Sequence, residues 1–305
     1  MNGPSASLSS SYRGRLAPSP TGYLHIGHAR TFRAAFARAR EAMGALVLRM
    51  EDLDSDRSRA EYATAALEDL RWLGMDWQEG PDVGGPYAPY LQSQRADLYR
   101  SAWRNLLEGG FLYPCRCSRK DLAAALSAPH EGADPDDEPA YPGTCRAPLR
   151  AGTQGHTDQT TGPEASIARD PRGANWRFRV PDGKPIEFVD ANLGPQRFVA
   201  GVDFADFVVM RRDGVASYQL ACVIDDAAMG ITEVVRGADL LKSTARQILL
   251  NRALGFCDPA WFHCGLVADS EGKRLAKRHD ALSIRTLRER GFSAADVLSD
   301  DLSRM

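Results

Sequence analysis

Short apolar runs alternate with segments of helical periodicity along the first third of the chain. Residues 13–17 are short enough for a buried strand, and the continuous apolar run at 45–50 is typical of a strand buried on both faces. Apolar residues recur at helical spacing in 27–43, 58–73 and 92–107. Strand, helix, strand and helix in this order predict an α/β domain with a parallel sheet.

The hydrophobic pattern breaks down between about Ser127 and Asn175. This stretch is dense in Gly, Pro, Asp, Thr and Ala and has almost no large apolar residues. Because it cannot bury enough surface to offset the entropy lost on ordering, we expect mobile loops there. Regular patterns then return, and they predict strands at 176–180, 207–211 and 232–235 and helices at 218–228 and 239–254.

These elements divide the chain into two halves of one α/β domain, separated by a small insertion that carries a pair of cysteines. No internal repeat is visible. The expected parts are a disordered lead-in at 1–12, a first half at 13–110, the insertion with its mobile loops at 111–200, a second half at 201–282, and a short tail at 283–305 in which 283–290 form one basic helix.

Composition changes this picture mainly by what it excludes. The chain has 305 residues, of which 43% are hydrophobic and 26% charged, as is ordinary for a globular protein. No run of about 18 apolar residues predicts a transmembrane helix, and the Ser-rich start lacks the pattern of a signal peptide. A formal net charge of -2 argues against indiscriminate nucleic-acid binding but is compatible with a local basic face. Six cysteines without a secretion signal suit thiols or metal ligands in a reducing compartment, so we expect a cytoplasmic protein.

A first candidate for phosphate binding opens the helix predicted at 27–43. His25 and His28 are three residues apart at a helix start, so their side chains point the same way. Backbone amides and the helix dipole already favour an anion at this place. Gly27 between the histidines would let a flat nucleotide base approach the backbone. Alternatively, the two histidines merely cap the helix or pack against it.

A second candidate is the basic run Lys273–Arg278, which follows a Ser-Glu-Gly turn. Four cations on a Gly-containing loop suit the charge that develops on a triphosphate, although a basic cluster alone is more often a solvated surface. The combination of the two motifs is more specific than either. It indicates a protein that binds a nucleoside triphosphate.

The segment 15–28 resembles the opening of class I glutamyl-tRNA synthetases, with their HIGH signature at its end. Residues 48–54 are similar to the acidic motif that follows in this family, and Arg274–Arg278 stands where the family has its KMSKS loop. The resemblance runs, with interruptions, from about Arg13 to Leu282. It implies the Rossmann-like parallel sheet of a class I aminoacyl-tRNA synthetase catalytic domain, with a small zinc-bearing insertion.

The reaction that the resemblance implies is in-line attack of an amino-acid carboxylate on the α-phosphate of Mg-ATP, with release of pyrophosphate. Positioning and charge stabilisation do the catalysis. Arg274 and Ala276 depart from the family pattern in the loop, so we expect a working but weaker loop. The ATP-binding residues implied are His25, Gly27, His28, Arg274 and Lys277, of which His25, His28 and Lys277 are catalytic.

A pocket for glutamate needs at least one guanidinium, whose fork matches a carboxylate, and one acid for the ammonium group. Glu51 falls at the C-terminal end of a predicted strand, where open α/β sheets bind ligands. Any single Arg or Tyr could instead make a surface ion pair or pack in the core. The resemblance implies glutamate-binding positions at Arg15, Ala17, Ser19, Glu51, Tyr218 and Arg236.

A zinc site is predicted at Cys115, Cys117 and Cys145, where a fourth oxygen or nitrogen ligand would close a tetrahedral structural site. In bacterial relatives within the resembled family, Cys-x-Cys is followed by Tyr-x-x-x-Cys with the tyrosine as fourth ligand, and Tyr141 matches that position. His130 is the rival ligand, and three unrelated free thiols are the simpler alternative. The remaining cysteines lack partner spacing and are interpreted as buried small residues: Cys222, Cys257 and Cys264.

Only 27 residues follow Arg278, whereas a full glutamyl-tRNA synthetase continues with anticodon-binding domains. This layout and the cysteine pattern resemble the glutamyl-queuosine tRNA(Asp) synthetases, which activate glutamate and attach it to queuosine in the anticodon stem-loop of tRNA(Asp). The resemblance thus implies ATP, L-glutamate and that modified RNA as partners. The alternatives are a short ordinary synthetase that charges the 3′ end of tRNA(Glu), a ligase for a small acceptor, and a non-catalytic RNA-binding relative.

Overall fold

The computed structural model describes residues 12–118, 121, 141–146, 170–266 and 283–299. The predicted lead-in up to residue 11, most of the loops predicted between Ser127 and Asn175, and the basic run Lys273–Arg278 lie outside the described residues.

The helices predicted at 27–43, 58–73, 92–107, 218–228 and 239–254 are confirmed within a few residues, and the last predicted helix, 283–290, is also present. The helices are α1 (Ile26–Glu41), α2 (Ala60–Trp72), α3 (Ala96–Glu108), α5 (Tyr218–Ala228), α6 (Leu241–Leu254), α7 (Ile284–Glu289) and α8 (Ala294–Leu298), with short 3-10 turns η1 (Gln92–Gln94) and η2 (Ala238–Leu240). The strands are β1 (Arg13–Leu16), β2 (Ala45–Leu48), β3 (Leu112–Cys115), β4 (Asn175–Phe178), β5 (Pro185–Asp190), β6 (Gly194–Val199), β7 (Phe207–Met210), β8 (Glu233–Gly237) and β9 (Ala260–Cys264).

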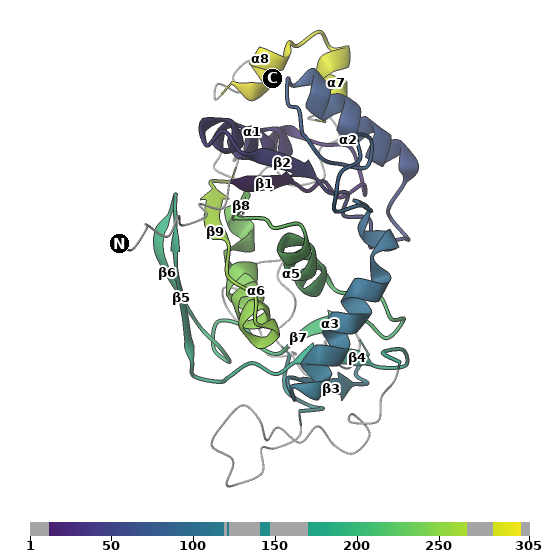
Figure 1. Ribbon diagram of the computed structural model, residues 1–305, viewed down its shortest axis with the longest axis vertical. Coiled ribbons are helices and arrows are strands. Elements are labelled where there is room, and N and C mark those ends of the chain that lie inside the picture. The colour runs from purple at the N-terminus through teal and green to yellow at the C-terminus, as the bar shows by residue number, and fades with distance from the viewer. Residues whose placement is uncertain (1–11, 119–120, 122–140, 147–169, 267–282, 300–305) are drawn as a thin grey trace, which may run out of the picture.

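Parallel strands lie between α1 on one side and α5 and α6 on the other (Figure 1). β1 pairs in parallel with β2, and β8 pairs in parallel with β9. β1 lies beside β8, where the Thr232 amide donates to the Arg13 carbonyl at 2.9 Å. Parallel neighbours need a crossover, which α1 supplies between β1 and β2 and α6 supplies between β8 and β9. The predicted parallel α/β architecture is therefore confirmed.

Side chains of these strands enter two hydrophobic cores, one on each face. Val234 of β8 packs with α3, α5 and α6, whereas Val235 packs with α1. In the same way Val47 of β2 enters the first core, and Leu46 and Leu48 enter the second. Successive side chains of a strand point to opposite faces, so a strand covered on both faces must be apolar throughout. This accounts for the continuous apolar run at β2.

Two smaller β units accompany the parallel strands. β3, β4 and β7 form an antiparallel sheet, so the strand predicted at 207–211 pairs with β4. β5 and β6 form an antiparallel hairpin that joins the edge of β9 through the pair Asp190 and Trp261. The sequence patterns did not predict β3, β5, β6, β9 or α8.

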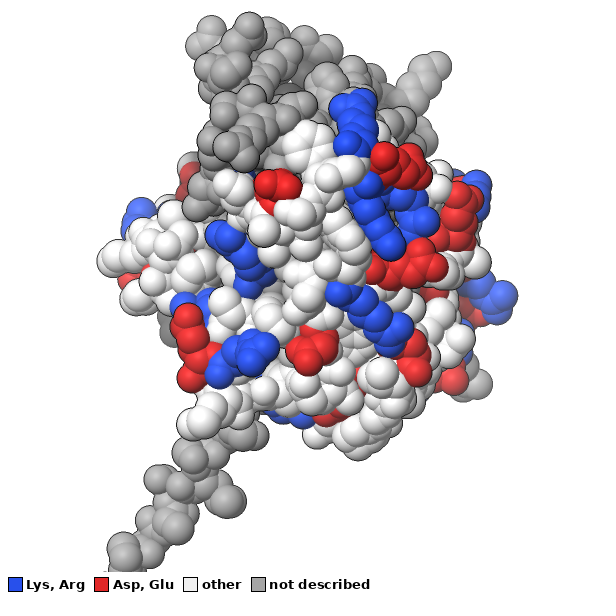
Figure 2. All heavy atoms as spheres, turned by 90° about the horizontal axis from the view of Figure 1, so that it is seen from above, with Lys and Arg blue, Asp and Glu red and all other residues white. Residues whose placement is uncertain are grey.

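No helix among the described residues is both long enough and apolar enough to cross a membrane. Figure 2 looks down on the end of the molecule that lies at the top of Figure 1, and basic and acidic side chains are mixed on that face. The visible charges therefore do not define a uniformly basic surface there among the described residues.

Candidate functional site

The predicted histidine pair lies at the start of α1, just after the loop that leaves β1. His25 caps this helix, because its Nδ1 accepts from the Gly27 amide at 3.1 Å. Nδ1 of His28 accepts from the His25 amide at 3.2 Å, and the two ring centroids are 3.8 Å apart. Since each Nδ1 is an acceptor, each neutral ring carries its proton on Nε2. The helix start thus combines two ring N–H donors with its own dipole, which suits an anion.

Gly27 also has a local packing role. A Cβ at this position would lie 2.9 Å from Cε1 of His25, closer than carbon atoms approach in folded proteins. Glycine therefore allows the His25 ring to fold back over the first turn. The approach of a nucleotide base to Gly27 stays a prediction.

Residues 267–282, which include Arg274 and Lys277, lie outside the described residues, but the chain resumes beside the histidines. Ser283 forms a β-bridge with His25. The amide after Ser283 donates at 2.8 Å to the carbonyl that precedes His25. The described chain that follows residue 282 is therefore attached to the histidine motif.

The ends of β1 and β2 carry three of the predicted glutamate-binding residues. The carbonyls on either side of Ala17 accept hydrogen bonds from the amides of Arg49 and Glu51, both at 2.9 Å. The loop that contains Ala17 and Ser19 is therefore held against Glu51. The Glu51 side chain is 7% exposed, whereas Ser19 is exposed. These residues lie at the carboxyl ends of parallel strands, the usual ligand site of such sheets.

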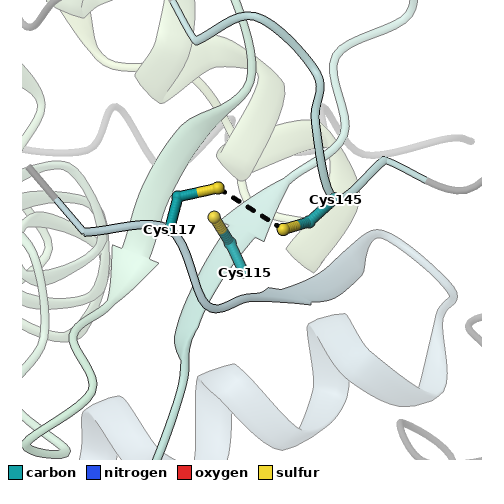
Figure 3. A group of neighbouring side chains, drawn as sticks. All are labelled: Cys115, Cys117 and Cys145. Carbon is teal, nitrogen blue, oxygen red and sulfur yellow. Dashed lines mark hydrogen bonds between the residues drawn. The ribbon is translucent and has the colours of Figure 1, made fainter. Parts of the chain in front are cut away.

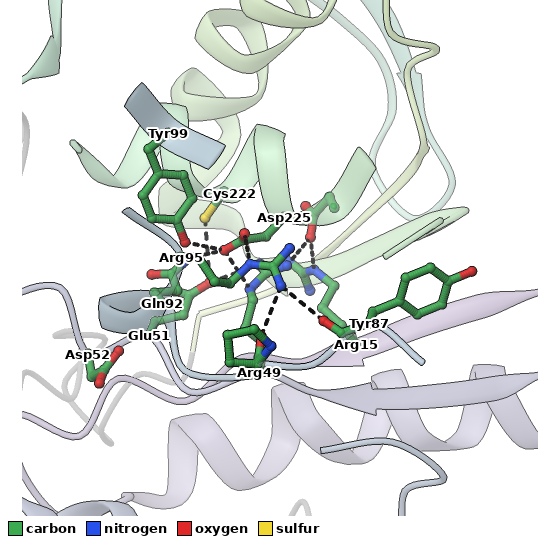
Figure 4. A network of polar contacts seen from close by, with 12 residues as sticks. Arg15, Arg49, Glu51, Asp52, Tyr87, Gln92, Arg95, Tyr99, Cys222 and Asp225 are labelled. Atoms are coloured by element: carbon green, nitrogen blue, oxygen red, sulfur yellow. Dashed lines mark hydrogen bonds and ion pairs between the residues drawn. The ribbon is translucent and has the colours of Figure 1, made fainter. Parts of the chain in front are cut away.

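Beside these strand ends lies a buried network of arginines and carboxylates (Figure 4). Arg49 is fully buried and donates to Asp226 at 2.6 Å and to Glu51 at 3.0 Å. Burial opposes the charge on Arg49, but the carboxylates, Asp226 foremost, outweigh it and raise its pKa well above the usual value. Arg15 donates to the Val235 carbonyl at 2.8 Å, and its Nε lies 3.6 Å from Asp226. That Nε is buried and makes no hydrogen bond within the described part of the chain, so its interaction with Asp226 is electrostatic.

Asp225, the neighbour of Asp226 on α5, holds this helix in place. It accepts hydrogen bonds from Gln92 at 2.8 Å, Arg95 at 2.6 Å and Tyr99 at 2.8 Å (Figure 4). Three donors satisfy the buried carboxylate, as burial of a charge requires. The helix that carries Tyr218 at its first turn is thereby tied to α3 and η1.

Tyr218 and Arg236 complete the group of residues around the strand ends. Nη1 of Arg236 donates to the Tyr218 hydroxyl at 3.5 Å. Burial raises the pKa of Tyr218, and the charges of Arg236, Glu51 and Arg15 all act on this hydroxyl. The structure thus gathers Arg15, Glu51, Tyr218 and Arg236. Two guanidiniums, one carboxylate and one hydroxyl can together bind a ligand that carries both carboxylate and ammonium groups.

Cys115, Cys117 and Cys145 bring three sulfur atoms within 4.8 Å of one another (Figure 3). Sγ of Cys117 and Sγ of Cys145 are 3.6 Å apart. Sulfur ligands at about 2.3 Å from a tetrahedral zinc are about 3.8 Å apart, so the three sulfurs fit a shared metal ion. The Tyr141 hydroxyl accepts from the Cys145 amide at 2.7 Å and lies 3.5 Å from Sγ of Cys115. Its rival as fourth ligand, His130, lies outside the described residues.

The sequence analysis missed several residues of these sites. It named no role for Arg49 or for Asp226, although a charged residue in an apolar run predicts a buried partner. It also overlooked His263, a fully buried histidine that contacts Arg236. The interpretation of all remaining cysteines as buried holds for Cys222 but is wrong for Cys257, which is exposed before β9, and Cys264 is only partly buried.

Comparison with known proteins extends these observations. The model of the family described as tRNA synthetases class I (E and Q), catalytic domain, matches residues 11–300. Glutamyl-Q tRNA(Asp) synthetase of Symbiobacterium thermophilum is 50% identical over 287 residues, which cover 93% of this chain and 84% of the relative. Glutamate--tRNA ligase 2 of Nitrosococcus oceani is 41% identical over 95% of this chain and 58% of the relative. A crystal structure of a glutamate tRNA ligase from Elizabethkingia meningosepticum, in complex with its amino acid, superposes with a TM-score of 0.73 at 29% identity, covering 93% of this chain and 54% of that one.

The chain therefore belongs to the class I tRNA synthetases of the E and Q group, and it is a ligase of the aminoacyl-tRNA synthetase type. Within this group it matches most of the length of a relative named Glutamyl-Q tRNA(Asp) synthetase, but only somewhat more than half of a glutamate--tRNA ligase. The resemblance identified from the sequence motifs is confirmed.

Proposed function

We propose that the protein activates L-glutamate with ATP in the absence of tRNA, and then transfers glutamate to queuosine at the wobble position of tRNA(Asp). The observation that carries this proposal is the grouping of Arg15, Glu51, Tyr218 and Arg236 at the carboxyl end of the parallel sheet. Two guanidiniums match the two carboxylates of glutamate, and Glu51 matches its ammonium. The name of the Symbiobacterium relative supports queuosine in tRNA(Asp) as the acceptor.

In the proposed reaction, the glutamate carboxylate attacks the α-phosphate of Mg-ATP in line and pyrophosphate leaves. His25 and His28 donate their Nε2–H groups to phosphate oxygens, which lowers the energy of the charged transition state. Lys277 adds a positive charge, while Arg274 and Gly27 contribute to ATP binding. Ala17 and Ser19 complete the glutamate pocket on the loop held against Glu51.

We also propose that the cysteine cluster holds one structural zinc ion, with Tyr141 as the fourth ligand. The sulfur spacing and the position of the Tyr141 hydroxyl support this assignment. Zinc would supply no chemistry to the reaction; its ligands would tie the end of β3 to the segment around Cys145. The same proposal includes the division of the chain into two halves of one catalytic domain with an insertion at 111–200 between them.

Two assays test the proposed reaction. ATP–pyrophosphate exchange with glutamate and no RNA measures the activation step alone. Transfer of labelled glutamate to tRNA(Asp) carrying queuosine measures the complete reaction, with unmodified tRNA(Asp) and tRNA(Glu) as controls. We expect label only on the modified tRNA, and ribonuclease digestion should recover it in the anticodon fragment and not at the 3′ end. Label on tRNA(Glu) that is recovered at the 3′ end would instead establish an ordinary synthetase.

A further inference from the structure

Arg236 is held from behind by a buried histidine on the neighbouring strand. Arg236 on β8 and His263 on β9 are direct partners in the parallel pairing. Nε of Arg236 lies 3.2 Å from Nε2 of His263, and Nη2 of Arg236 donates to the Thr244 hydroxyl at 2.7 Å. Arg236 is 5% exposed, and His263 and Thr244 are fully buried. Two edges of the guanidinium are thus occupied by the protein, and the remaining nitrogen, Nη1, is directed to Tyr218.

Asp190 determines which nitrogen of the His263 ring carries the proton. Its Oδ2 lies 2.6 Å from Nδ1 of His263, and its Oδ1 accepts from the amides of Asn192 and Leu193. Burial opposes ionisation of Asp190, yet the hydrogen bonds from His263, Leu193 and Asn192 outweigh it and lower the pKa of the carboxyl. An ionised carboxylate only accepts hydrogen bonds, so Nδ1 of His263 must be the donor.

His263 is neutral in this arrangement. Burial, and next the charge of Arg236, lower its pKa to about 4 although the bond to Asp190 favours the protonated ring. A neutral ring with its proton on Nδ1 has a bare Nε2, which accepts from Nε of Arg236 and also lies 3.0 Å from the Thr244 hydroxyl, a second possible donor. The opposite tautomer would point an N–H group at the N–H of Arg236 and break this contact.

We infer that His263, oriented by Asp190, is a positioning residue that fixes the Arg236 guanidinium for recognition of the amino-acid carboxylate. The inference rests on the proposed function, because it takes Arg236 as a glutamate ligand. Neither His263 nor Asp190 touches the substrate in this scheme. They fix the direction of Nη1 of Arg236. This matters because a misdirected guanidinium makes a weaker charge-assisted hydrogen bond to a carboxylate.

An isosteric substitution tests the orientation without creating a cavity. In Asp190→Asn the new amide oxygen can still accept from the amides of Asn192 and Leu193, and the new NH2 group faces Nδ1 of His263. Because this NH2 group is a donor, Nδ1 must become an acceptor, and the proton of the His263 ring moves to Nε2. We expect the KM for glutamate in pyrophosphate exchange to rise about 10- to 100-fold, the effect of losing one hydrogen bond to a charged group. The KM for ATP should stay within about twofold, because ground-state ATP binding does not involve Arg236.

The matched control is His263→Gln, whose side-chain oxygen can replace Nε2 as the acceptor without help from Asp190. This variant should keep the KM for glutamate within about threefold, and Asp190→Asn combined with His263→Gln should restore most of the loss. A double variant worse than either single one, with both KM values changed together, would overturn the inference and indicate a purely structural cluster. Thermal unfolding of all variants checks that they fold.

If the proposed function is wrong, the wild-type protein will show no glutamate-dependent ATP–pyrophosphate exchange. In that case ¹⁵N NMR of the histidine side chains decides on the orientation alone, with the signals of His263 assigned by their loss in His263→Gln. A ring protonated only on Nδ1, which changes to Nε2 in Asp190→Asn, supports the inference. A wild-type ring protonated on Nε2 or on both nitrogens would overturn it.

Discussion

Asp69 should make the stability of this protein depend on pH in an unusual direction. The residue lies on α2, facing α7, and its side chain is fully buried. Neither carboxylate oxygen has a hydrogen-bond partner among the described residues, and the nearest cation, Arg285, lies 3.7 Å away. Burial raises the pKa of Asp69 to about 6, although Arg285 and Arg288 oppose the shift. The ionised form is therefore poorly accommodated in the native state.

The change Asp69→Asn removes this charge at almost constant shape. A rise in pKa from 3.8 to about 6 corresponds to about 3 kcal/mol. Between these values the native protein keeps a proton that the unfolded chain has released, so the free energy of unfolding falls as the pH rises. Wild type thus loses this contribution on going from pH 4 to pH 7, and the variant does not. We expect equal stability near pH 4 and a variant more stable by about 2–3 kcal/mol at pH 7.5.

Urea unfolding followed by tryptophan fluorescence, at several pH values from 4.5 to 8, measures this difference. Asp97→Asn on α3 is the control, because that side chain is 95% exposed and its substitution should change stability by less than about 0.5 kcal/mol. A gain for Asp69→Asn that is the same at every pH would show that the carboxyl does not titrate in this range. A variant less stable than wild type at pH 8 would show that the pair with Arg285 is net stabilising.

The sites described above lead to three further expectations. Cys145→Ser should abolish stoichiometric zinc binding, measured by elemental analysis of purified protein. Tyr141→Phe should weaken zinc binding and lower the thermal unfolding temperature. Zinc retained at full affinity in Tyr141→Phe would favour another fourth ligand. Glu51→Gln should raise the KM for glutamate in pyrophosphate exchange about 10- to 100-fold and leave the KM for ATP nearly constant, since it removes the charge that pairs with the ammonium. Gly27→Ala should lower kcat about 100-fold through displacement of the His25 ring, and a crystal structure of an active variant with an unmoved ring would contradict this.

Features set by local sequence were predicted well. The start of α1 at the histidine motif, and the apolar run of β2, depend on residues that are neighbours in the chain. The motif around the histidines and the Cys-x-Cys pair are local patterns too. Strand pairing is different, because it depends on segments far apart. The strand at 207–211 was predicted as an element, but nothing in its own residues indicates that β4 is its partner.

The charged residues of the pocket illustrate the same limit. Asp226 contacts Arg49 across 177 positions of sequence, and Cys222 lies 3.5 Å from Glu51 across 171. Such contacts arise only after β1 and β2 have been placed beside α5. The acidic motif after β2 pointed to Glu51, whereas Asp225 and Asp226, the other carboxylates beside Arg49, lie inside a helix with no motif of their own.

A physical rule would have found part of what was missed. Arg236 lies within the apolar strand β8, and a guanidinium with 5% exposure must have acceptors, because burying an unpaired charge is costly. In a parallel sheet one such acceptor can come from the adjacent strand at the same level, as His263 does here. β9 reads Ala-Trp-Phe-His-Cys, and its histidine is the one residue there whose neutral ring offers a strong acceptor. Its second nitrogen then needs a partner in turn, which the last residue of β5, Asp190, provides. A buried arginine in a predicted strand thus predicts a polar residue on the neighbouring strand. That residue needs a hydrogen-bond partner in turn, and the series of hydrogen bonds continues until a group reaches a ligand or the backbone.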